Sequence, residues 1–197
     1  TTLRVSTYPS SDDPIYGFSL ISSLENLEIL ENSSNFVDIS DETLLAIVSK
    51  CHKLRELLLA LNTRVTDQSI AQIPQHLPQL SKLCITDTKI SDYSLAILSE
   101  LKSLVYLDIS GSSGVTDAGV ESMVDGCRTL EFMQLNRCEA VTAEALRFCV
   151  KTITDSEDRD LFADLAFKLI LAADVISNGY VSRQSKDLNQ NGPIDSG

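Results

Sequence analysis

Apolar residues recur along this chain in triplets with the spacing Leu-x-x-Leu-x-Leu, and polar or variable residues fill the positions between them. Five copies are recognisable: Leu24/Leu27/Ile29, Leu54/Leu57/Leu59, Leu80/Leu83/Ile85, Leu104/Leu107/Ile109 and Leu130/Met133/Leu135. The last two letters of each copy are two residues apart, so their side chains point to the same face of an extended chain. The pattern therefore predicts five short strands, each with one buried face.

A second phrase, Ile/Val-Ser/Thr-Asp, follows each triplet. Its copies begin at Ile39, Val65, Ile90, Val115 and Val141, which are 26, 25, 25 and 26 residues apart. A hydroxyl followed by a carboxylate favours a helix start, because the hydroxyl caps free N–H groups and the carboxylate offsets the helix dipole. Apolar residues three apart then indicate a helix with one buried stripe, as at Leu95 and Leu98. We interpret the Asp residues as helix starts, with no other role.

A single strand and helix cannot bury both of their apolar faces, so units of this kind must stack on their neighbours. The pattern predicts an α/β fold of about five to six stacked repeats of 24–26 residues over residues 1–153. Leu3 and Val5 match the end of a triplet, and we expect a first repeat that is truncated. After a charged break, residues 154–176 are interpreted as a C-terminal helix that caps the stack or binds a partner. Residues 177–197 are polar and turn-rich and are predicted to be a disordered tail.

The pattern resembles the leucine-rich repeat, and more narrowly its cysteine-containing subtype, in which Cys-x-x-Leu opens a repeat. The Cys-x-x-Leu motif occurs at Cys51–Leu54 and Cys127–Leu130. Leu77 and Leu101 replace the cysteine in two other repeats, and Ala143 replaces the Asp of the last Ile/Val-Ser/Thr-Asp phrase. The resemblance covers residues 20–150. It implies a ribonuclease-inhibitor-like horseshoe arc and a relation to F-box substrate receptors of cullin-type ubiquitin ligases and their F-box-less relatives. No F-box-like segment occurs in the sequence, so we expect any ligase-binding part to precede Thr1.

The composition limits the classes of partner that the chain can bind and the cell compartment in which we expect it. The net charge of −12 argues against nucleic-acid and anionic-membrane partners, because phosphate binding needs clustered Lys and Arg. The acidity serves solubility or steers a basic partner. No apolar run reaches the roughly 18 residues of a membrane span. Five cysteines without a signal peptide indicate reduced thiols in a cytoplasmic or nuclear protein, and the chain lacks the Cys-x-x-Cys spacing typical of zinc sites.

The sequence offers little catalytic chemistry. Its two histidines are His52 and His76, and a Cys51–His52 pair is disfavoured because Cys51 belongs to the buried ladder of repeat positions. The segment Gly111–Gly114 lacks the lysine of a phosphate-binding loop. We therefore expect no enzyme activity, no metal and no cofactor.

The residues that alternate with the apolar residues of each triplet should project from the concave face of the arc. We expect them to bind a partner protein there. The candidate binding residues are Glu56, Leu58, Lys82, Cys84, Tyr106, Asp108, Phe132 and Gln134. Tyr106 and Phe132 lie next to each other in this arrangement, as in a protein-binding hot spot, unless the C-terminal helix folds over them. Two functions are open: the substrate-recognition repeats of an F-box ubiquitin ligase receptor, and a scaffold or regulatory adaptor outside ubiquitination.

Overall fold

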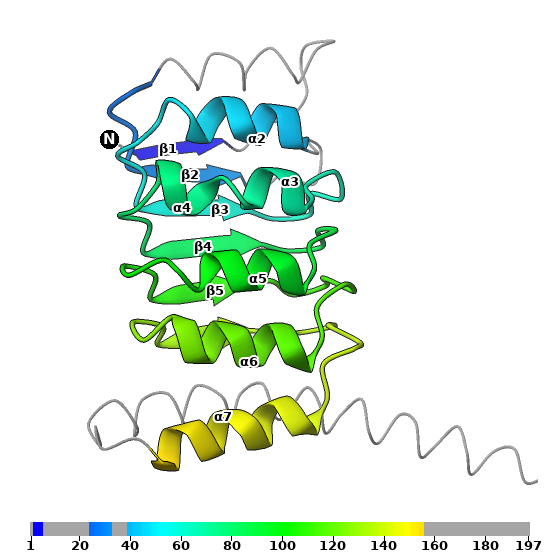
Figure 1. Ribbon diagram of the computed structural model, residues 1–197. Coiled ribbons are helices and arrows are strands. Elements are labelled where there is room, and N and C mark those ends of the chain that lie inside the picture. Colours follow the sequence, from blue (N-terminus) through cyan, green and yellow to red (C-terminus); the bar gives the residue numbers. More distant parts are fainter. Residues whose placement is uncertain (1, 6–23, 33–38, 156–197) are drawn as a thin grey trace, which may run out of the picture.

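The fold is a row of strand–helix units that lie side by side in chain order (Figure 1). The computed structural model describes residues 2–5, 24–32 and 39–155. Its six parallel strands are β1 (Thr2–Val5), β2 (Ile29–Asn32), β3 (Glu56–Leu59), β4 (Lys82–Ile85), β5 (Tyr106–Asp108) and β6 (Phe132–Gln134). Its helices are α2 (Asp41–Val48), α3 (Asp67–Ile70), α4 (Ile73–His76), α5 (Asp92–Leu98), α6 (Asp117–Gly126) and α7 (Ala143–Asp155).

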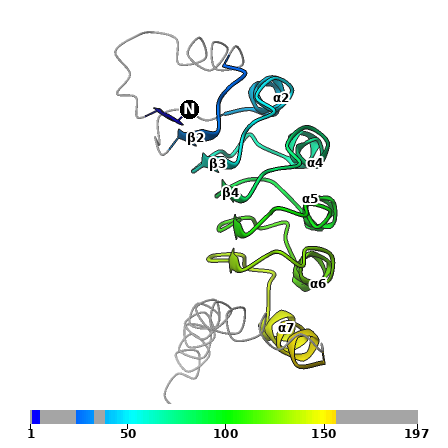
Figure 2. The same cartoon turned by 90° about the vertical axis from the view of Figure 1, so that its left-hand side faces the viewer.

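All described strands form one parallel sheet with the order β1-β2-β3-β4-β5-β6, and the helices cover one face of it (Figure 2). Residues on the strands alternate between buried and partly exposed, so that Leu57 and Leu59 face the helices while Glu56 and Leu58 face away. The buried residues of all units form one continuous hydrophobic core. The predicted parallel arrangement of short strands and amphipathic helices is confirmed.

The spacing of the two layers makes the stack curve. Neighbouring strands lie about 4.8 Å apart, whereas packed helices need about 8–10 Å. A row in which each strand carries a helix therefore bends with its strands on the inside. In Figure 2 the strands accordingly lie closer together than the helices do. The sheet face that points away from the helices is thus the concave side of the stack.

The helices begin as the hydroxyl–carboxylate phrase predicts. Ser40, Thr66, Ser91 and Thr116 are the residues that precede α2, α3, α5 and α6, and each side chain accepts a hydrogen bond from a backbone N–H of the first turn. Ile70 and Ile73 also lie three residues apart and are buried, but they belong to two short helices, α3 and α4. Pro74 near the start of α4 fits this break, because proline is tolerated only in the first turn of a helix.

The prediction for the first triplet was wrong by three residues. Leu30 pairs with Leu57 and Asn32 pairs with Leu59, so the first triplet runs Leu27, Leu30, Asn32 rather than Leu24, Leu27, Ile29. Asn32 is fully buried at the place of a leucine, whereas Leu24 is 42% exposed. The N-terminal strand does follow its predicted phase, because Leu3 pairs with Leu30.

The described cysteines are free thiols, as the sequence predicts. Cys51, Cys127, Cys138 and Cys149 are buried. The Cys127 thiol lies 3.3 Å from the backbone oxygen of Leu101, to which it donates a weak hydrogen bond. Within the described ranges, no helix is long and apolar enough to cross a membrane. Residues 156–176 of the predicted C-terminal helix and the predicted tail at residues 177–197 lie outside the described residues, and residues 154 and 155 belong to the end of α7.

Candidate functional site

The eight candidate residues lie together on the concave sheet face, which we call the open face. The strand register joins them in two rows: Glu56, Lys82, Tyr106 and Phe132 in one, and Leu58, Cys84, Asp108 and Gln134 in the other. Each of these side chains is partly exposed, and the residues between them are buried. Because of the corrected register, Ile29 and Glu31 of β2 extend these rows.

An aromatic stack occupies the C-terminal part of the open face. The rings of Tyr106 and Phe132 lie 4.9 Å apart between centroids and are inclined by 7°. On the other side of Tyr106, the ammonium nitrogen of Lys82 lies 4.9 Å from the ring centroid. Aromatic pairs contribute about 0.5–1.5 kcal/mol beyond area burial, and a cation over a ring adds about 0.5–1 kcal/mol at an exposed site. The stack is thus held in place before any partner arrives.

Hydrogen bonding fixes the Tyr106 ring further. Its hydroxyl donates to the Gln134 side-chain oxygen at 3.1 Å. Burial, together with the negative charge of Asp108 and a smaller contribution from Cys84, raises the pKa of Tyr106 to about 12. The group therefore remains a neutral phenol at physiological pH.

The second row contains a thiol–carboxylate contact. Asp108 accepts hydrogen bonds from the backbone N–H and the hydroxyl of Ser110, at 3.0 and 2.6 Å, and from the Cys84 thiol at 3.8 Å. Burial and the Asp108 charge raise the pKa of Cys84 to about 12. A nucleophilic cysteine needs the thiolate form, so Cys84 is a poor nucleophile.

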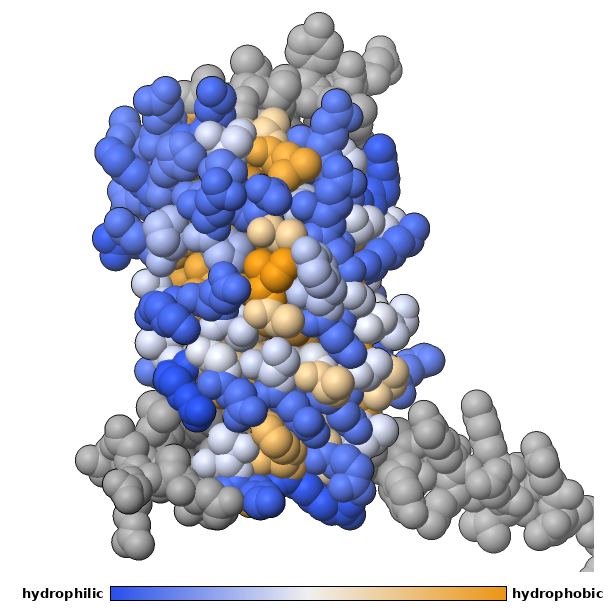
Figure 3. Space-filling model, viewed as in Figure 1, coloured by the Kyte–Doolittle hydropathy of each residue, from blue (hydrophilic) through white to orange (hydrophobic). Residues whose placement is uncertain are grey.

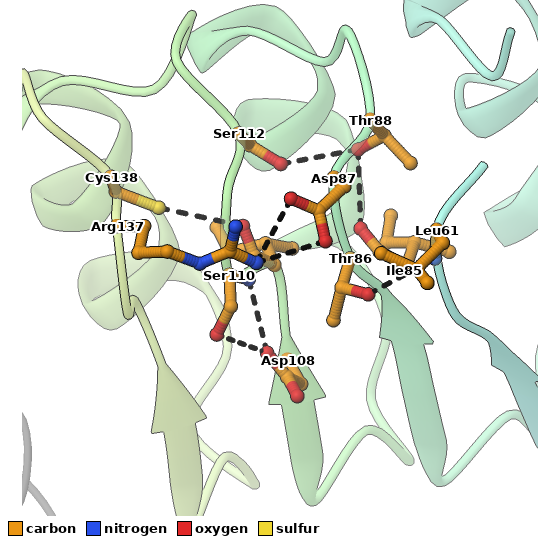
Figure 4. A network of polar contacts seen from close by, with 11 residues as sticks. Leu61, Ile85, Thr86, Asp87, Thr88, Asp108, Ser110, Ser112, Arg137 and Cys138 are labelled. Atoms are coloured by element: carbon orange, nitrogen blue, oxygen red, sulfur yellow. Dashed lines mark hydrogen bonds and ion pairs between the residues drawn. The ribbon is translucent and has the colours of Figure 1, made fainter. Parts of the chain in front are cut away.

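A turn follows each strand from β3 to β6, and at one position in this turn the backbone has a positive φ. The four residues at this position are Leu61, Asp87, Gly111 and Arg137, with φ values of 59°, 57°, 79° and 59°. Figure 4 shows the turns of the last three of these units side by side. Such a conformation is costly for a residue with a side chain unless the surroundings favour it.

Three of the four positions have a structural explanation. Arg137 forms an ion pair with Asp87 at 2.9 Å, and the two residues belong to units that are not neighbours (Figure 4). Gly111 lies between them, where a Cβ atom would overlap the Asp87 carboxylate. Leu61 takes no part in such an arrangement and is 38% exposed.

The helix side carries a carboxylate ladder that the sequence analysis missed. Each Asp of the repeated phrase accepts hydrogen bonds from the backbone N–H and the hydroxyl of the equivalent phrase in the next unit. The pairs are Asp41 with Thr66, Asp67 with Ser91, Asp92 with Thr116 and Asp117 with Thr142. Ser69 and Ser94 add a third hydrogen bond, to Asp41 and Asp67. These Asp residues therefore link neighbouring units, in addition to their position at the helix starts.

The ladder lowers the pKa of its first two carboxyl groups. Burial alone would raise the pKa of Asp41, but the hydrogen bonds from Ser69 and Thr66 outweigh it, so the pKa lies below its ordinary value. Asp67 behaves in the same way, with donors from the next unit. The carboxylates are therefore ionised at neutral pH, when they accept most strongly.

The histidines do not form a catalytic pair with a cysteine. His52 is exposed whereas Cys51 is fully buried, so the two side chains point apart. His52 instead stacks on His76 of the next unit, with 5.9 Å between ring centroids and an inclination of 18°. Within the described ranges, no group of three or more His, Cys, Asp or Glu residues is placed to hold a metal ion.

The helix side differs from the open face in character. Its surface is mostly hydrophilic, with small separate apolar areas (Figure 3). A shallow depression there of about 400 Å³ is lined by residues that include Leu45, Gln72 and His76. Tyr93 on α5 is 61% exposed and has no aromatic neighbour within contact among the described residues. The aromatic pair Tyr106–Phe132 therefore distinguishes the open face.

Comparison with known proteins supports the fold. No family model matches the chain. A chain of the yeast Rad7–Elc1 complex is similar in structure, with a TM-score of 0.58 and 19% identity over 70% of this chain. That match spans 38% of the Rad7–Elc1 chain, so the protein corresponds to less than half of it. The tropomodulin C-terminal domain from Caenorhabditis elegans is similar over 79% of this chain and 97% of the domain, with a TM-score of 0.53 and 12% identity.

Proposed function

We propose that this chain is a leucine-rich-repeat module of the cysteine-containing subtype and that it binds a partner protein on its open face. The observation that carries the proposal is the Tyr106–Phe132 stack, whose rings pack on each other and remain partly exposed. A few residues dominate the binding energy of protein interfaces, and tyrosine is enriched among them. The regular strand–helix units, and strands that lie closer together than the helices, support the repeat class.

The same residues favour binding over catalysis. Cys84, the one partly exposed thiol among the described cysteines, is held protonated by its surroundings. Asp108 beside it is occupied by the hydrogen bonds from Ser110. The face thus lacks an activated nucleophile or a free base next to one. We propose that the chain has no enzymatic activity of its own and acts in the cytoplasm or nucleus, where its free thiols stay reduced.

The more specific form of the proposal is that these are the substrate-recognition repeats of a cullin-type, F-box-containing ubiquitin ligase receptor. It is supported by the Cys-x-x-Leu openings and by the structural likeness to a chain from a two-protein complex, Rad7–Elc1. The alternative is a scaffold or regulatory adaptor outside ubiquitination. The likeness to the tropomodulin domain extends over 97% of that domain, so the fold alone does not separate the two forms.

Affinity capture from cell extract tests both levels of the proposal. The baits are the chain itself, a natural transcript product extended at its N-terminus, and the double variant Tyr106→Ala/Phe132→Ala. Tyr93→Ala is the matched control, because it removes an exposed tyrosine from the helix side. Mass spectrometry should show a protein that the chain and the control capture and that the double variant loses.

The outcomes separate the two forms. If the extended bait captures cullin and the adaptor subunit of the ligase, the ligase-receptor form is supported. If no bait captures them, a scaffold or regulatory role outside ubiquitination is favoured. If the double variant captures the same proteins as the unmodified chain, the open face is not the binding site and the proposal fails. The thermal midpoint of the double variant should stay within a few degrees of the original, because both rings are partly exposed. A larger loss would mean that the rings belong to the core.

A further inference from the structure

One carboxylate on the open face, that of Glu56, has no positively charged partner among the described residues. Glu56 lies directly beside Lys82 in the register of β3 and β4. The Lys82 ammonium is directed to the Tyr106 ring, however, at 4.9 Å from its centroid. The Glu56 carboxylate makes no hydrogen bond or ion pair with any residue in the described part of the chain. Its negative charge is therefore available to a partner.

The other charges of the two rows differ from Glu56. Asp108 is compensated by the two donor groups of Ser110 and by the Cys84 thiol. Lys82 is engaged with the aromatic ring. Glu31 of β2, which extends the second row, also has a partner within the protein. A partner that covers this area must supply a cation, because burying an uncompensated carboxylate is costly. Neither a nucleic acid nor an acidic peptide meets that requirement.

The distance between Glu56 and the aromatic stack defines the spacing of the partner's groups. Glu56 is on β3 and Phe132 is on β6, three strands away in the same row. At about 4.8 Å per strand, the separation is about 14 Å. An extended chain advances about 3.4 Å per residue, so about four residues cover this distance, and residues four apart point to the same side.

We propose that the open face binds an extended segment of a partner protein that runs across the strands, with a Lys or Arg opposite Glu56 and an aliphatic or aromatic side chain on the Tyr106–Phe132 edge about four residues away. This inference rests on the proposed function and specifies the chemistry of the partner. An extended segment fits better than a helix, because the two rows are only two residues, or about 7 Å, apart, and a helix is about 10–12 Å wide.

A library of displayed random 12-residue peptides tests the proposal on the whole chain. Selected peptides should be enriched in a basic residue and an apolar residue about four positions apart. Glu56→Lys should weaken the binding of such a peptide at least tenfold, and replacing the basic residue of the peptide by Glu should restore it. Glu42→Lys is the matched control on the helix side, where Glu42 is exposed, and it should leave binding unchanged. Binding should also weaken as salt is raised.

The outcomes separate this inference from the proposed function. Three results would each overturn the extended basic segment. They are selected peptides that lack a basic residue, peptide binding by Glu56→Lys that equals that of the unmodified chain, and no rescue by the charge-reversed peptide. If the captured partner is lost with Tyr106→Ala/Phe132→Ala but retained with Glu56→Lys, the open face is still the binding site and only the inferred chemistry is wrong. If the partner is retained with the ring variant, the proposed function itself fails, and this inference fails with it.

Discussion

Replacing Asp67 by alanine tests whether the carboxylate ladder holds neighbouring units together. Asp67 begins α3 and accepts three hydrogen bonds from the next unit: the backbone N–H of Ser91 at 2.8 Å, the Ser91 hydroxyl at 2.6 Å and the Ser94 hydroxyl. None of these donors belongs to its own helix. The substitution therefore removes an inter-unit contact and leaves the hydrophobic core unchanged.

The expected loss of stability follows from the number and setting of these bonds. A hydrogen bond to a charged group contributes about 1.5–3 kcal/mol net. The three share one acceptor group that is partly exposed, and water can replace Asp67 at the Ser91 donors. Ser94 is fully buried, so its hydroxyl loses its partner outright, at a cost of about 1–3 kcal/mol. We expect Asp67→Ala to lower the free energy of unfolding by about 2–4 kcal/mol.

Urea denaturation followed by circular dichroism measures this change, and it suits a chain without tryptophan. Adding Ser94→Ala to Asp67→Ala should recover part of the loss, because it removes the unsatisfied hydroxyl. Asp92→Ala should cost less, since Asp92 has only the two donors of Thr116 and faces Gly119, whereas Asp41 and Asp67 each face a serine. A change below about 0.5 kcal/mol for Asp67→Ala, which is the range of ordinary surface substitutions, would refute the role of the ladder.

Acid pH provides a second test of the same group. The folded-state pKa of Asp67 is depressed, because its hydrogen bonds outweigh the effect of burial. Its contribution to stability is therefore present above the ordinary carboxyl pKa of about 4 and is lost as the pH falls through the folded value. The difference between the original chain and Asp67→Ala should narrow below pH 4. A difference that stays constant down to pH 2 would contradict the assigned ionisation.

Three further predictions follow from the fold. Leu107→Ala opens a cavity at a fully buried position and should lower the free energy of unfolding by about 2–5 kcal/mol in urea titrations. Gly111→Ala, at φ 79°, should cost about 1–3 kcal/mol and weaken the Asp87–Arg137 ion pair, which is seen as a smaller penalty for Arg137→Ala in that background. Because the folded pKa of Cys84 is raised to about 12, stability should fall as the pH rises above 9, and less so in Cys84→Ala.

Most of the fold could be predicted from the sequence, because the repeated apolar positions are the positions whose side chains are buried. From Leu54 onward, each letter of the triplets is buried where the pattern places it. The first triplet failed because Leu24-x-x-Leu27-x-Ile29 fits the apolar pattern, whereas the true triplet ends in Asn32. A buried asparagine is stable only when its polar atoms find partners in the folded chain. Apolar spacing cannot reveal that, so the register was misjudged.

The candidate site was predictable in its position and not in its interactions. Period-two alternation and the repeat length together placed Tyr106 beside Phe132, and the register confirms that neighbourhood. The direction of Lys82, toward the ring and away from Glu56, depends on rotamers that no sequence pattern encodes. The ladder did leave a signal in the sequence. A hydroxyl precedes each Asp in the repeated phrase, and the phrase at Ala143, which lacks the carboxylate, is the last of the series.

The ladder also gives the stack a direction. Each carboxylate holds the unit that comes after it in the chain, and among the described residues no Asp of the series bonds backward to the unit before it. During synthesis, therefore, every acceptor is in place before its donors leave the ribosome, and units can be added one at a time. The same polarity bears on gene duplication. A copy of a middle unit carries both a hydroxyl and an Asp and continues the series, whereas a copy of the unit with Ala143 would interrupt it.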